Sequence, residues 1–154
     1  MCNINTFVSI KYNGLECNKW YTIDMYVFGE CNLPFRVDPY NDSDYIMFGV
    51  LAGVCHKTDS GKFVCHQFGI DCDTPEDVRY EYIEMRDIDT NDDVHDIGHV
   101  TLDELKAAYH NKADFTKIER KSLKPLISGI EFMRDAAGWD VADPNVRLDF
   151  FFEG

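Results

Sequence analysis

The amino-acid sequence predicts an α+β fold: a single domain in which an antiparallel sheet, including an N-terminal hairpin and the C-terminal strand, packs with about three helices. Strand-like patterns stand at both ends of the chain, and capped helical patterns stand between them. Size also favours this fold, because 154 residues with 45% hydrophobic content can bury one core. No linker or low-complexity segment divides residues 1–154, so we expect one domain.

The N-terminal strands follow from alternation and from a turn signal. Residues 5–12, NTFVSIKY, alternate as a half-buried strand does. Asn13 and Gly14 form a dipeptide that is typical of tight hairpin turns. A second strand is therefore expected over residues 19–28, KWYTIDMYVF.

A buried helix and another hairpin are expected next. Asp42 or Ser43 can cap the apolar run that follows, which predicts a helix over residues 44–53. Residues 54–66, VCHKTDSGKFVCH, place apolar flanks around a polar stretch that contains a glycine. This pattern predicts a hairpin.

The middle of the chain is acidic and then helical. Residues 78–85, VRYEYIEM, follow the breaker Pro75 and predict a short strand or a helix. Thr101 and Glu104 have the spacing of a capping box, so a helix should begin there and end near residue 111.

The C-terminal part predicts a longer helix and a strand. Residues 122–138, SLKPLISGIEFMRDAAG, suit a helix if Pro125 lies in its first turn. Residues 145–152, NVRLDFFF, have the composition of a strand.

The formal net charge of −13 is concentrated in one region. Residues 71–104 hold thirteen Asp or Glu against two Arg, a net of −11, whereas residues 105–134 hold seven Lys or Arg against three acidic residues, a net of +4. Proteins that bind nucleic acids neutralise phosphates with a basic patch. We therefore expect a basic protein partner and no direct binding of nucleic acid.

The first residues show no pattern of a secretion signal, and this predicts the cellular compartment of the protein. MCNINTFVSIKYNG has no basic segment that leads into an apolar run, and nowhere do eighteen apolar residues follow one another. We expect a soluble, cytoplasmic protein without membrane contact. In a reducing cytosol its six cysteines should be free thiols.

The cysteines of residues 54–66 leave three interpretations open. In the expected hairpin Cys55 lies opposite Cys65, so the two thiols could fill a core, share a metal ion or form a disulfide. His56 and His66 would point to the opposite face, and the chain has no CxxC knuckle. Both observations weigh against zinc.

His95 and His99 are the other weak candidates for metal ligands. Their spacing of four is useful on a helix, but Gly98, just ahead of the Thr101 cap, favours a loop. No GxSxG elbow, P-loop or GxGxxG is present to position a nucleophile or a phosphate. We therefore expect neither a cofactor nor enzymatic activity.

Four stretches resemble motifs of a group of small acidic proteins encoded by bacteriophages and prophages. MFGVLAGVC (47–55), GIDCDTPEDV (69–78), HDIGHVTLDEL (95–105) and NVRLDFFFEG (145–154) correspond to LFGVLAGVR, GLPxDxS, LTLxEL and VRLVFWFD patterns in that group. Cys55 stands where the group has Arg, and Cys72-Asp73 interrupts the second pattern. The resemblance implies a phage origin and a fold, and it favours the inhibitors of host defence, such as anti-CRISPR proteins.

The acidic segment is the candidate site for a partner. Carboxylates on a rigid surface can imitate the phosphates of a nucleic acid and occupy a basic groove. We therefore predict a phage-encoded inhibitor of a host nucleic-acid-directed defence system, which acts in the cytoplasm of the infected bacterium. The predicted partner-binding residues are Glu76, Asp77, Glu81, Glu84, Asp87, Asp89, Asp92, Asp93 and Asp96.

Three other interpretations of the sequence stay open. The acidic segment could be an ordinary solvated face. The basic residues and aromatics of 105–134 could hold a nucleotide second messenger of host immunity, so that the protein is a binding module or a sponge. A metal-dependent enzyme is the third alternative.

Overall fold

The computed structural model describes residues 2–12, 19–23, 26–28, 34–40, 42–65, 68–88 and 93–154. Its centre is a four-stranded antiparallel sheet in the order β2-β1-β6-β5. The strands are β1 (Asn3–Ile10), β2 (Tyr21–Thr22), β5 (Val94–Thr101) and β6 (Val146–Glu153). A second, two-stranded sheet joins β3 (Tyr26–Phe28) to β4 (Pro34–Arg36). The prediction of an α+β fold with an N-terminal hairpin and a C-terminal strand is confirmed.

The pair β1 and β6 forms the middle of the sheet. It is in register along its whole length, from Asn3 opposite Glu153 to Ile10 opposite Val146. Strand β6 is buried on both faces at every position except its last residue, Glu153. A strand that is covered on both sides is apolar almost throughout, which explains the run Phe150-Phe151-Phe152.

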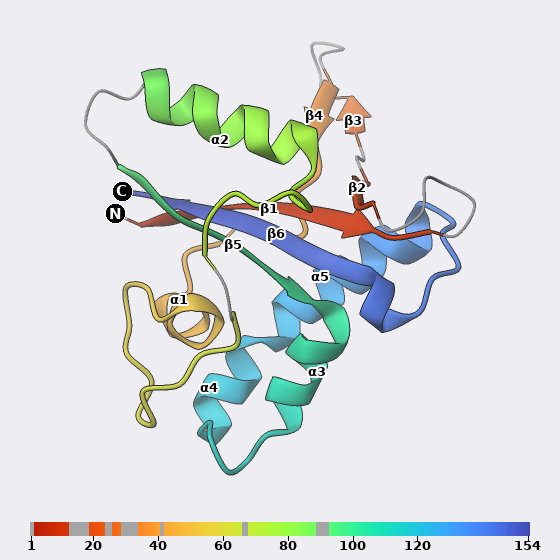
Figure 1. Cartoon of the computed structure of the whole chain (residues 1–154). Helices are drawn as coiled ribbons and strands as arrows, with labels where there is room; N and C mark the ends of the chain where they lie inside the picture. Colours follow the sequence, from red (N-terminus) through yellow and green to blue (C-terminus); the bar gives the residue numbers. More distant parts are fainter. Residues whose placement is uncertain are drawn as a thin grey trace.

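Helices cover the two faces of the sheet unequally (Figure 1). The helix α2 (Glu76–Ile88) lies across one face, on the side where β3 and β4 also lie. The other face carries the four other helices of the described residues, and a short 3-10 turn (Asp143–Asn145) precedes β6. These four are α1 (Tyr45–Ala52), α3 (Leu102–His110), α4 (Lys117–Ser122) and α5 (Lys124–Ala136).

Alternation along β6 divides the core into two clusters. Leu148, Phe150 and Phe152 point into the larger cluster, beneath α1, α3 and α5. Phe151 points the other way, into a smaller cluster that α2 closes. Side chains of successive strand residues point to opposite faces, so one strand supplies both clusters.

The expected helices are present, with small shifts in their boundaries. Helix α1 is capped by Asp44, whose carboxylate accepts from the amides of Ile46 and Met47, and not by Asp42 or Ser43. The capping box of α3 is confirmed, because the Glu104 carboxylate accepts from the Thr101 amide at 2.9 Å. The segment 78–85, left open between strand and helix, belongs to α2. Pro125 lies in the first turn of α5, as expected.

The hairpin predicted over residues 54–66 is wrong. No strand forms within residues 54–65, and the segment is a loop that folds back onto α1. The amides of Val64 and Cys65 donate to the carbonyls of Val50 and Leu51, each at 2.9 Å. The last carbonyls of a helix lack partners within it, so this loop satisfies two of them. Residue 66 lies outside the described residues.

Two further predictions of local structure need correction. The loop expected at His95 and His99 is the edge strand β5, whose pairing with β6 is interrupted by a bulge between His95 and Gly98. The single strand expected over 19–28 is divided, because β2 and β3 belong to different sheets. The Asn13-Gly14 turn falls outside the described residues.

Candidate functional site

Helix α2 is amphipathic, and its inner side fixes how it lies on the sheet. Val78 is fully buried, and Tyr82 and Met85 pack on the same small cluster. The Tyr82 ring meets Phe151 edge to face, with ring centroids 5.3 Å apart. Residues 78, 82 and 85 follow the i, i+4, i+7 spacing of one helical side, so the opposite side must face solvent.

The solvent side of α2 carries five of the predicted partner-binding residues. We call this surface the acidic face; it consists of Glu76, Asp77, Glu81, Glu84 and Asp87. Four of them are exposed and Glu81 is half-buried. Tyr80 stands among them with 67% of its surface exposed, so the acidic face also offers an aromatic side chain.

The two basic residues of α2 have different contacts. Arg79 is turned toward the preceding loop, where its guanidinium donates to the Asp71 carbonyl at 2.8 Å. Arg86 is exposed, and its Nε lies 3.8 Å from the Asp87 carboxylate. The Thr22 hydroxyl of β2 donates to the Asp77 carboxylate, which ties the start of α2 to the sheet.

Two of the other predicted partner-binding residues, Asp93 and Asp96, lie beside or on β5 and not on α2. Asp93 is exposed next to the start of β5, and its carbonyl accepts from the Gly154 amide. Asp96 lies at the bulge of β5 with φ 52°, and its carboxylate is 2.7 Å from Nδ1 of His95. Asp89 and Asp92 lie outside the described residues.

The loop ahead of α2 is held by a turn centred on Asp71. Its carboxylate accepts from the Asp73 amide at 2.9 Å and from the Thr74 hydroxyl at 3.1 Å. Burial raises the pKa of Asp71, but these hydrogen bonds and the nearby His99 and Arg147 outweigh it and hold the pKa below its usual value. The turn therefore fixes the entry of α2 with a carboxylate that stays ionised.

A buried ion pair lies on the same face of the sheet. Arg147 and Asp149 are both 2% exposed, with Nη2 and Oδ1 2.9 Å apart. The Ser9 hydroxyl donates to the Asp149 carboxylate at 2.6 Å, and the Arg147 guanidinium also donates to the Asp73 carbonyl at 2.8 Å. Arg147 lies over the Trp20 ring at 4.7 Å. The pair thus connects β6 to β1, to Trp20 just before β2 and to the loop that positions α2.

The electrostatics of this pair are those of a structural anchor. Burial raises the pKa of the Asp149 carboxyl, while Arg147 and the Ser9 hydroxyl act in the opposite direction. Sequence analysis missed this anchor, although a signal was present. Arg147 and Asp149 stand two apart in an otherwise apolar strand, and that spacing puts both on one face.

The weak metal candidates are not brought together. Cys55 is exposed, whereas Cys65 is buried with its thiol 3.6 Å from the His99 carbonyl. The His95 ring stacks on Phe152 with ring centroids 6.0 Å apart, whereas His99 is near enough to Asp71 and Asp149 to act downward on the pKa of both carboxyls. Within the described part of the chain, no three His, Cys, Asp or Glu side chains form a group that could hold a metal ion.

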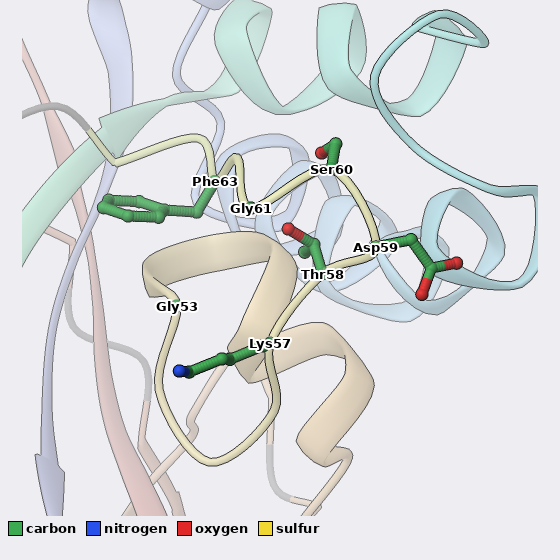
Figure 2. A pocket seen from close by; sticks show the side chains of 7 residues that line it. All are labelled: Gly53, Lys57, Thr58, Asp59, Ser60, Gly61 and Phe63. Atoms are coloured by element: carbon green, nitrogen blue, oxygen red, sulfur yellow. The ribbon is translucent and has the colours of Figure 1, made fainter.

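A hollow of about 570 Å³ lies in the loop after α1 (Figure 2). It is lined by Gly53, Lys57, Thr58, Asp59, Ser60, Gly61 and Phe63. The side chains of Lys57 and Asp59 point in opposite directions, so they do not converge on a common ligand. Binding sites for small molecules have a few polar groups that converge, and this hollow lacks such a set.

A smaller cavity of about 230 Å³ lies between α3 and α5, within the basic region. Its basic lining residues are Lys106, His110 and Lys124. Lys106 already binds Asp143 at 2.6 Å and lies 3.4 Å from Glu131.

Comparisons with protein-family models, with curated proteins and with solved structures give no match. Among the described residues, no helix is both long enough and apolar enough to cross a membrane.

Proposed function

We propose that the protein is a phage-encoded inhibitor of a host nucleic-acid-directed defence protein, and that it binds the basic groove of that protein through the acidic face of α2. The observation that carries this proposal is the exposure of the acidic face on a helix that is anchored rigidly beneath. The phage origin rests on the motif resemblance alone.

The spacing of the carboxylates supports mimicry of a single strand. The acidic face extends from residue 76 to residue 87, about 17 Å at 1.5 Å per residue. Five carboxylates over this length are on average about 4 Å apart along the helix axis, which is near the axial spacing of about 3.4 Å between phosphates along one strand. Duplex DNA carries twice that density, so α2 suits a groove that accommodates one strand.

Rigidity gives the acidic face a second property of a phosphate backbone. The inner side of α2 is packed against Phe7 and Phe151, and its first turn is tied to β2 and to the Asp71 turn. Charges that are held in place before binding lose little entropy on association. Tyr80 adds an aromatic contact of the kind that is enriched at protein interfaces.

Capture from a lysate of the bacterial host, followed by mass spectrometry, identifies the partner. The test of the acidic face is the triple variant Glu76→Gln, Glu84→Gln and Asp87→Asn. Its matched control is Asp42→Asn, Asp59→Asn and Asp140→Asn, which removes the same charge from three exposed carboxylates elsewhere. Exposed charges accelerate encounter over about 8 Å at physiological salt, so they act mainly on the association rate.

We expect the α2 variant to associate at least tenfold more slowly than the parent at low salt, with a much smaller change in the dissociation rate. The control variant should lose far less. If both variants inhibit and associate like the parent at low salt, the acidic face is only solvated and the proposal is wrong.

A nucleotide messenger is the second candidate, and the cavity between α3 and α5 is its natural place. At about 230 Å³ that cavity is smaller than the range of about 300–1,000 Å³ that is usual for ligand pockets. A panel of cyclic dinucleotides tests it, since a ligand that binds only the native state raises the melting temperature. A flat response across the panel removes this candidate.

A further inference from the structure

The solvent side of α4 and α5 carries a row of exposed residues at helical spacing, which we call the α4–α5 stripe. Leu123, the one residue between the two helices, has αR backbone angles (φ −73°, ψ −21°), so the helical spacing continues from α4 into α5. Residues three or four positions apart are neighbours on one side of a helix. The stripe covers about 22 Å at 1.5 Å per residue. It consists of Lys117, Lys121, Lys124, Ser128 and Phe132, all of them exposed.

The three lysines of the stripe form no ion pair with any other residue that the structure describes. Other lysines of this protein do have such partners. The Lys62 ammonium lies 2.6 Å from the Asp114 carboxylate, and the Lys106 ammonium lies 2.6 Å from that of Asp143. The stripe therefore presents three positive charges that an external anion can approach.

The stripe is separated from the acidic face. The two surfaces lie on opposite sides of the sheet, which stands between α2 and the pair α4 and α5 (Figure 1). One helix with its side chains is already about 10 Å across. Charges on the protein surface that are farther apart than about 8 Å are largely screened at physiological salt. The local field at the stripe is thus set by its lysines more than by the net charge of −13.

A cavity adjoins the middle of the stripe. It is the cavity of about 230 Å³ between α3 and α5, and Lys124 and Ser128 line it together with His110. Their ammonium, hydroxyl and imidazole groups are hydrogen-bond donors of the kind that a phosphate oxygen accepts from. Glu131 also lines the cavity, but the Lys106 ammonium lies 3.4 Å from its carboxylate.

The stripe ends in an aromatic side chain. Phe132 is 61% exposed, although phenylalanine is usually buried. Proteins that bind single-stranded nucleic acids combine a basic track for the phosphates with exposed aromatic rings on which bases stack. The α4–α5 stripe has both parts in one row.

We propose that the α4–α5 stripe binds a single-stranded nucleic acid, with phosphates along its lysines and a base stacked on Phe132. This inference does not depend on the acidic face or on the proposed inhibitor function. It departs from the expectation that the protein does not bind nucleic acid directly. That expectation came from the charge of the whole chain, which does not show how the charges are separated in the fold.

A single strand fits the stripe better than three other anionic partners. A duplex keeps its bases stacked on one another, so they cannot reach Phe132. An anionic membrane needs a continuous apolar face beside the lysines. The large apolar side chains that α4 and α5 expose are Ile118 and Phe132, which are about 21 Å apart along the helices. The acidic face of a second copy belongs to a molecule with the same net charge of −13, so the two copies repel each other.

Fluorescence anisotropy with labelled oligonucleotides of about 12 nucleotides tests the proposal on the purified full chain. The expected result is binding at low salt that is stronger for a single strand than for a duplex of the same length. Three phosphate contacts on a single strand predict a slope of about −2 for log K against log salt, since each contributes about −0.7.

The test variant is Lys117→Gln, Lys121→Gln and Lys124→Gln. It should bind about tenfold more weakly or worse at low salt, and its salt slope should approach zero. The matched control is Lys19→Gln, Lys57→Gln and Arg86→Gln, which removes the same charge from three exposed basic residues elsewhere. The control should keep most of the affinity and the slope, and the melting temperature of each variant shows that it is folded.

Replacements of Phe132 separate stacking from charge. Phe132→Ala should weaken binding about fivefold or more without changing the salt slope, whereas Phe132→Trp should bind at least as tightly as the parent. The proposal is overturned if the parent does not bind at low salt, if the two triple variants lose affinity alike, or if Phe132→Ala binds like the parent. Tighter binding to vesicles of anionic lipid, or self-association that the lysine variant abolishes, would also overturn it and would identify a membrane or a second copy as the partner.

Discussion

At the residue scale, the contacts of Arg147 and Asp149 explain why two charges are tolerated beneath a helix. Each charge has a partner, and the surrounding hydrogen-bond sites are used by Ser9 and by the Asp73 carbonyl. A buried pair of this kind contributes little net stability against an apolar replacement, but a broken pair is costly. We infer that the main role of the pair is to hold the loop before α2 in place, since Arg147 donates to the Asp73 carbonyl of that loop.

Asp149→Asn should therefore destabilise the protein more than removal of both charges. The single change leaves the Arg147 charge buried without its counterion, at a cost of about 3–5 kcal/mol. The double variant Arg147→Met and Asp149→Leu should lose clearly less, as measured by urea unfolding. If the double variant is the less stable of the two, the pair contributes attraction and not only position.

Asp143 predicts how stability depends on pH. It binds Lys106 at 2.6 Å and Arg134 at 2.7 Å, which joins α3 and α5 to the turn before β6. The hydrogen bond from Lys106, assisted by Arg134, holds the pKa of Asp143 below its usual value of 3.8. A carboxylate with a lowered pKa stabilises the fold fully above its unfolded-state value, and this contribution is lost as the pH falls through the folded-state value.

Asp143→Asn should thus melt about 2–4 °C below the parent near neutral pH, which corresponds to about 1 kcal/mol for a partly exposed network. The difference should shrink below a pH of about 3.8, where the parent carboxylate also becomes protonated. A difference that stays constant down to a pH of about 2 would contradict the role of this charge.

At the scale of elements, the sequence predicted the helices whose ends are set by neighbouring residues, and it failed where a tertiary contact decides the structure. The apolar run of α1, the capping box of α3 and Pro125 of α5 are sequence-adjacent features, and all three helices are present, although the cap of α1 is Asp44 and not Asp42 or Ser43. The hairpin over 54–66 failed because its amides bond to α1 carbonyls, a tertiary contact that no spacing reveals. Strand β5 was missed because its bulge interrupts the alternation on which strand prediction depends.

The candidate site was predictable in composition but not in geometry. The charge of residues 71–104 indicated an acidic surface, and α2 carries five of its carboxylates on one side. The contacts by which Arg147 anchors α2 were not predictable in full, because they join residues from four segments of the chain.

The position of each carboxylate along α2 predicts opposite effects on stability. The helix dipole favours negative charge at the N-terminus and disfavours it near the C-terminus. Glu84→Gln with Asp87→Asn should therefore stabilise the fold by about 0.3–1 kcal/mol, whereas Glu76→Gln should destabilise it by a similar amount. Thermal unfolding at low salt measures both. Equal signs for the two variants would show that the dipole does not govern this helix.

At the scale of the whole molecule, the acidic face lies on the side of the sheet that carries the smaller part of the core. Among the described residues, one face of the sheet holds four helices and the larger part of the core, and the other holds α2 with its acidic face beside the β3–β4 pair (Figure 1). Like charges on one helix repel one another, so this arrangement lowers stability where it concentrates charge. Surfaces that are kept despite such a cost are commonly those that function requires.

This arrangement makes a final prediction about salt. Raising the ionic strength from about 0.01 M to about 0.15 M shortens the screening length from about 30 Å to about 8 Å, so the melting temperature of the parent should rise as repulsion weakens.

Two triple variants test where this repulsion is concentrated. Each removes three negative charges and so changes the net charge from −13 to −10. The first variant is Glu76→Gln, Glu84→Gln and Asp87→Asn, and its control is Asp42→Asn, Asp59→Asn and Asp140→Asn. If repulsion is concentrated on α2, the first variant should show a distinctly smaller rise with salt than the control. If it is spread evenly over the surface, the two variants should respond alike, and the acidic face would then have no special electrostatic character.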